Sequence, residues 1–173
     1  MSGPPPPQRI PADVGAARAL VTDVTNRLEQ TIARAGSFTD AERHQRVNDE
    51  WSTLESLRHI VFVVDIWLGK LIKGEGDPFH PMGLPPHFAP RVPPGSSIDA
   101  DADPSFEEAC DVLRGRLATL ASFVDELDAD GLTRENPTHA KTTAGALGVI
   151  FDELTYHDGF INRDLNAIEE ARG

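Results

Sequence analysis

Residues 52–71, STLESLRHIVFVVDIWLGKL, decide the fold. Ser52 and Glu55 have the spacing of a capping box, which marks the start of a helix. Apolar residues then recur every three or four positions, the period of one helix face, and others widen this stripe. A helix that is apolar on nearly every side is expected at the centre of a bundle. The stripe consists of Leu54, Leu57, Val61, Val64, Leu68 and Leu71.

Three more stretches have a helical period, at 12–35, 104–127 and 142–170. Asp103 and Pro104 are expected to start the helix that follows them, as N-cap and first-turn proline. Residues 74–103, rich in proline and glycine, are expected to be a long loop between the second and third helices. Four amphipathic helices without a convincing strand predict an all-α four-helix bundle.

Shorter segments complete this organisation. Residues 37–46 offer a short helix in which Thr39 and Glu42 are spaced as a capping box. Residues 128–141 are expected to form a polar turn region. Residues 1–11 contain five prolines and are expected to be a disordered tail, ahead of a single domain over 12–173.

Composition excludes several classes of function. The chain has 16 Lys and Arg against 28 Asp and Glu, a net charge of −12, which disfavours binding to nucleic acid. No apolar run approaches the ~18 residues that span a membrane, and no secretory signal is recognisable. The single cysteine, Cys110, excludes a disulfide framework within the chain. A cytoplasmic protein is expected.

The fourth helix carries a histidine at a position where the period of its apolar face predicts a core residue. His157 follows Ile150 by seven positions, and Glu153 lies one turn before it on the edge of the same face. His59 on the second helix also lies among apolar residues. The three side chains could bind one divalent ion between two helices. Two hydrogen-bonded core histidines are the alternative, because glutamate four residues before histidine also occurs elsewhere in this chain.

Three segments carry a resemblance to a known family. They are EWSTLESLRHIVFVVDIWL at 50–68, HPMGLP at 80–85 and DELTYHDGFINRDLNAI at 152–168. The chain resembles the DinB-like superfamily, which includes mycothiol-dependent maleylpyruvate isomerases and bacillithiol transferases. The resemblance implies a four-helix bundle that binds a divalent metal through three histidines, one on the second helix and two on the last. His59 and His157 match that pattern, and Glu153 stands in place of the third histidine.

The resemblance also implies a chemistry. A set of two histidines and one carboxylate suits zinc, nickel, iron(II) or manganese. The implied activity is a thiol-dependent, mycothiol-type S-transferase or isomerase that acts on a small-molecule substrate with a low-molecular-weight thiol as cosubstrate. A metal-dependent hydrolase and a non-catalytic, stress-linked metal- or ligand-binding protein are the alternatives. His80 and Arg163 are candidate accessory residues of the pocket, although a salt bridge to Asp164 or to another helix is favoured for Arg163. A homodimer is expected.

Overall fold

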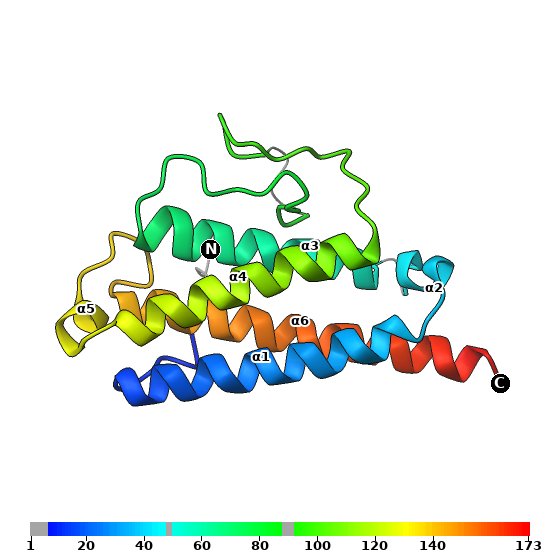
Figure 1. Ribbon diagram of the computed structural model, residues 1–173, viewed down its shortest axis with the longest axis horizontal. Coiled ribbons are helices and arrows are strands. Elements are labelled where there is room, and N and C mark those ends of the chain that lie inside the picture. The colour runs from blue at the N-terminus through cyan, green and yellow to red at the C-terminus, as the bar shows by residue number, and fades with distance from the viewer. Residues whose placement is uncertain (1–6, 48–49, 88–91) are drawn as a thin grey trace, which may run out of the picture.

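The computed structural model of the chain describes residues 7–47, 50–87 and 92–173. These residues are mostly helical and contain no strand, which confirms the predicted all-α class (Figure 1). The elements are α1 (Val14–Gly36), α2 (Asp40–His44), α3 (Thr53–Val64), the π-helical η1 (Asp65–Ile72), α4 (Phe106–Glu126), α5 (Ala129–Thr133) and α6 (Thr143–Ala171).

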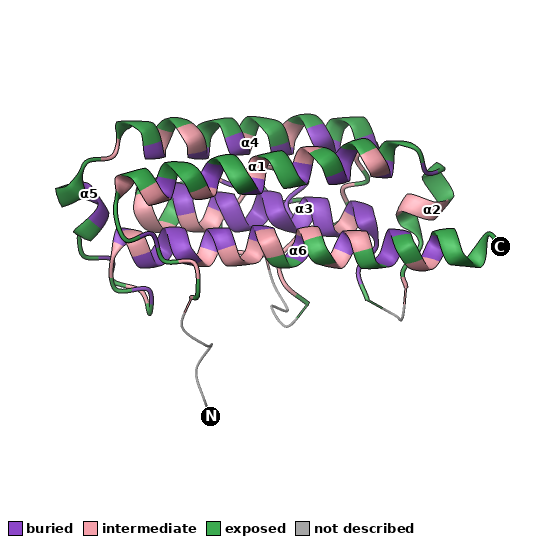
Figure 2. Ribbon diagram, turned by 90° about the horizontal axis from the view of Figure 1, so that it is seen from below, coloured by how far each residue is buried: buried purple, intermediate pink, exposed green. Residues whose placement is uncertain are grey.

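The long helices lie side by side (Figure 1). Both α1 and α3 pack against α4 and α6, so each of the four has two long neighbours. Their apolar faces meet in one core. As predicted, α3 is buried on almost every side, and Glu55 is its only residue that is not buried (Figure 2). This placement brings His59, near the middle of α3, against the neighbouring helices.

The helix starts follow from local hydrogen bonds. Capping boxes at Ser52 of α3 and Thr39 of α2 are both present, which confirms these two predictions. The predicted start of the third long helix at Asp103 is wrong, because Ser105 caps α4 through a reciprocal pair with Glu108. The expectation of a plain turn region after α4 is also wrong, since the side chain of Asp128 caps the short helix α5.

The second long helix changes its winding at Asp65, where α3 passes into η1. The sequence period predicts a uniform α-helix to Leu71, whereas residues 65–72 form a π-helix. Asp65 is buried and accepts hydrogen bonds from the guanidinium of Arg116 and from the backbone N–H of His80, at 2.8 Å for the latter. Wider π turns are frequent at functional sites. Here the π-helix carries Ile66 and Trp67, which line the cavity described below.

The ends and loops frame these helices. Residues 8–10 of the predicted tail contact α6, and residues 1–6 of that tail fall outside the described part of the chain. The described residues between η1 and α4 form turns and no helix.

None of the helices in the described ranges is long and apolar enough to cross a membrane. The boundary of the domain at residue 12 stays a prediction.

Candidate metal centre

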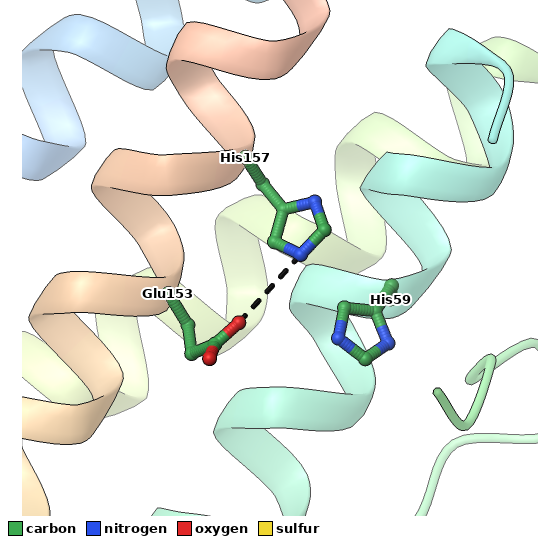
Figure 3. A group of neighbouring side chains, drawn as sticks. All are labelled: His59, Glu153 and His157. Carbon is green, nitrogen blue, oxygen red and sulfur yellow. Dashed lines mark ion pairs between the residues drawn. The ribbon is translucent and has the colours of Figure 1, made fainter. Parts of the chain in front are cut away.

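His59, Glu153 and His157 lie together between α3 and α6 (Figure 3). Each offers one ligand atom, and these atoms all lie within 4.8 Å of one another. Glu153 and His157 project from successive turns of α6, and His59 projects toward them from α3 (Figure 3). Both histidines are buried and Glu153 is half-buried. The structure thus brings together the three side chains that the sequence analysis selected.

The orientation of His59 is fixed by a loop. Its Nδ1 lies 2.8 Å from the backbone carbonyl oxygen of Leu84, which can only accept, so Nδ1 carries the proton. Burial lowers the pKa of His59 to about 4, and the neighbouring His157 lowers it as well. The imidazole is therefore neutral at pH 7, and its Nε2 has a lone pair. A backbone acceptor on the second nitrogen is the usual partner of a metal-binding histidine.

The spacing of Glu153 and His157 suits a shared ion. Their atoms Oε2 and Nε2 are 3.6 Å apart, beyond the length of a direct hydrogen bond. Two ligands of a tetrahedral ion, each at about 2.0–2.1 Å, are about 3.3 Å apart. The nearby imidazole of His157 lowers the pKa of Glu153, so this carboxylate is ionised at neutral pH. An imidazole nitrogen and a carboxylate oxygen are both ligands that a divalent cation accepts.

His157 also bears on the alternative of two hydrogen-bonded core histidines. Its Nδ1 is buried and has no hydrogen-bond partner among the described residues. A core histidine that serves only the fold should have both ring nitrogens paired, because a buried unpaired polar atom costs about 1–3 kcal/mol. A histidine that binds a metal through Nε2 also usually pairs its Nδ1, so this unpaired atom does not distinguish a metal site from two core histidines.

Trp51, which directly precedes the cap of α3, packs on the two histidines. Its ring centroid is 4.3 Å from that of His59 and 5.7 Å from that of His157. The indole N–H donates to Nδ1 of His87 over 2.8 Å. The sequence analysis selected neither Trp51 nor His87 as a site residue. No periodic signal marks a loop histidine that reaches the site through a tryptophan.

A cavity of about 630 Å³ borders the cluster. His59 and Glu153 form part of its wall. Apolar side chains from α3, η1 and α6 make up much of the rest, and the N-terminal segment contributes as well. An ion held by the cluster would have this cavity beside it, with room for a small molecule. The apolar lining residues of these three elements are Phe62, Val63, Ile66, Trp67 and Val149.

Two predicted accessory residues lie elsewhere. His80 is held beside Asp65, and its Nδ1 accepts from the N–H of Met82 over 3.2 Å. Arg163 pairs with Asp164 at 3.2 Å and with Glu50, as the sequence analysis favoured. Neither His80 nor Arg163 is among the described residues that line the cavity.

Fold and site together define an all-α protein with a buried histidine–glutamate–histidine cluster that could hold a metal ion. A family model of the DinB superfamily matches residues 23–161, which span most of the chain and include all three residues of the cluster. The chain belongs to the DinB superfamily. The search of curated proteins gives no significant match. The search of solved structures gives none either.

Proposed function

We propose that this DinB-type four-helix bundle holds one divalent metal ion through His59, Glu153 and His157, and that it is a thiol-dependent S-transferase or isomerase. The gathering of three ligand atoms within 4.8 Å beside a cavity carries this proposal. When bound, such an ion supplies Lewis acidity, which lowers the pKa of a thiol that it coordinates. Zinc, nickel, iron(II) and manganese all suit this set of ligands.

The residues of the chain have distinct roles in this proposal. Leu84 orients His59 through its carbonyl oxygen, so that Nε2 is the donor atom. Glu153 contributes the negative charge that offsets part of the charge of the ion. Trp51 covers the two imidazoles, which limits the access of water and strengthens the electrostatic interactions in the site.

The thiol in this reaction is a cosubstrate, because the chain has no suitable thiol of its own. Cys110, the only cysteine of the sequence, is buried, and burial raises its pKa to about 11. It lies on α4, among residues of the core, and is not one of the residues that line the cavity. A protonated, inaccessible thiol is a poor nucleophile. An external thiol and an electrophilic small molecule are therefore the expected substrates.

Metal content tests this proposal first. The untagged chain is reloaded with zinc, nickel, iron(II) or manganese and analysed by elemental mass spectrometry, beside His59→Ala, Glu153→Ala and His157→Ala. We expect about one ion per native chain and a large loss in each variant, because three ligands act together. His44→Ala, an exposed histidine on α2, is the matched control and should retain the ion.

The activity is then measured as the consumption of a small thiol with an electrophilic aryl halide. Turnover that requires both thiol and metal supports the transferase. Turnover of ester substrates without thiol would instead favour a hydrolase. A native chain that takes up no ion from any of the four solutions, while all variants remain folded by circular dichroism, would refute the metal centre.

A further inference from the structure

The N-terminal segment forms part of the cavity wall beside the candidate metal centre. Pro7, Gln8 and Arg9 line the cavity together with residues of α3, η1 and α6. The backbone N–H of Gln8 donates to Oδ2 of Asp152 over 2.6 Å, and Nη1 of Arg9 donates to Oδ1 over 2.9 Å. Both oxygens of one carboxylate thus hold this segment. Asp152 directly precedes Glu153, so the attachment lies next to a residue of the cluster.

A second contact fixes the same segment one helical turn away. Ile10 lies directly over Gly148 of α6. A Cβ atom at position 148 would lie 3.1 Å from Cγ1 of Ile10, 3.2 Å from its Cα and 3.3 Å from its backbone nitrogen. These distances are too short for a comfortable fit, so a side chain at position 148 would push the segment away. Gly148 and Asp152 are four positions apart and face the same way on the helix.

The residues that line the cavity indicate which kind of chemical group it suits. Phe62 and Trp67 offer aromatic surface, with Val63, Ile66 and Val149 as aliphatic neighbours. Among the described residues that line the cavity, Arg9 is the only Arg or Lys, and it is paired with Asp152. The cavity therefore suits an uncharged, planar, apolar group far better than an anionic one.

We propose that residues 7–10 are a strap that closes a substrate pocket for an uncharged aromatic group, whose attached donor atom faces His59 and Glu153. This inference rests on the proposed metal-dependent function. The strap makes Asp152 and Gly148 specificity-determining residues, because they hold the wall against which the aromatic group lies. Substrates without such a group would leave the apolar lining wet and would bind more weakly.

Thiol binding to the cobalt(II)-loaded full chain tests the inference. The probes are benzyl mercaptan, 2-mercaptoethanol and 4-(mercaptomethyl)benzoate, titrated by calorimetry and by the thiolate-to-cobalt absorption band. We expect benzyl mercaptan to bind about tenfold more tightly than 2-mercaptoethanol, since the phenyl ring is buried. The benzoate, with the same ring and an added charge, should bind more weakly than benzyl mercaptan. Equal affinities of the aromatic and the aliphatic thiol would overturn the aromatic pocket, and a tighter benzoate would show that Arg9 selects an anion.

The strap is tested by Gly148→Ala/Asp152→Ala, which removes both anchors and leaves a good helix former at each position. Glu170→Ala, an exposed residue of the same helix, is the matched control. Trypsin cleavage after Arg9 measures strap release without metal and should be faster in the double variant only. The preference for benzyl mercaptan should fall to about threefold or less, as that wall is lost. Fast cleavage with an unchanged preference would overturn the role of the strap.

Failure of the proposed function is recognised separately. If the chain takes up no cobalt, the proposed metal centre is refuted before any thiol is added, and the inference about substrates is refuted with it. A chain that takes up cobalt but binds all three thiols alike retains the metal centre and loses only the aromatic pocket. Slow trypsin cleavage in both the native chain and the double variant would show that the two contacts on α6 do not hold the strap.

Discussion

The buried, neutral His59 makes the stability of the metal-free protein depend on pH. Its pKa is about 4 in the folded chain, against about 6.5 for an exposed histidine. Between these values the unfolded chain binds a proton that the folded chain does not. This contribution to stability is therefore complete above pH 6.5 and is lost as the pH falls toward 4. At about 1.4 kcal/mol per pH unit, the loss is about 2 kcal/mol by pH 5 and approaches about 3 kcal/mol at lower pH.

Urea unfolding in EDTA, from pH 7.5 to 4.5, measures this effect. His59→Gln has no imidazole and should lose about 2 kcal/mol less than the native chain by pH 5. Glu153 has a lowered pKa, so its contribution is also lost on acidification and is shared by both chains. His139→Gln, an exposed histidine, is the matched control and should follow the native curve. Parallel curves for the native chain and His59→Gln would refute the burial argument.

Two further predictions concern the framework around the site. Arg116→Met should lower the free energy of unfolding by about 3–5 kcal/mol in urea titrations, because the buried carboxylate of Asp65 loses its cationic partner and keeps only the N–H of His80, whereas Asp65→Asn with Arg116→Met should recover much of it. An equal loss in both would show that packing, not charge, dominates. Gly145→Ala should destabilise α6 by about 1–3 kcal/mol in the same assay, because its Cβ would lie 2.1 Å from a backbone oxygen, whereas Gly159→Ala, with open space, should stabilise it by up to about 1 kcal/mol.

Periodicity predicted the parts of the fold and site that repeat along the chain. The apolar face of residues 52–71 predicted a central helix, and the inward register of His157 and Glu153 followed from the period of α6. Features that do not repeat along the chain leave no periodic pattern in the sequence. The passage of Ile10 over Gly148 is a contact between segments distant in sequence, and no pattern in the apolar period marks the change to a π-helix at Asp65.

The segment at residues 80–85, one of the three that resemble the DinB-like superfamily, positions a candidate metal ligand. It supplies none of the three candidate metal ligands, yet α3 holds it at three points. Nε of Arg58 donates to the carbonyl of Met82 over 2.7 Å, and the N–H of Leu84 donates to the carbonyl of Arg58 over 3.3 Å. Leu84 then accepts from His59. Because Pro85 follows, the backbone of Leu84 is restricted to extended conformations. The loop can therefore present one carbonyl in a fixed direction, and that carbonyl selects which nitrogen of His59 is the donor atom.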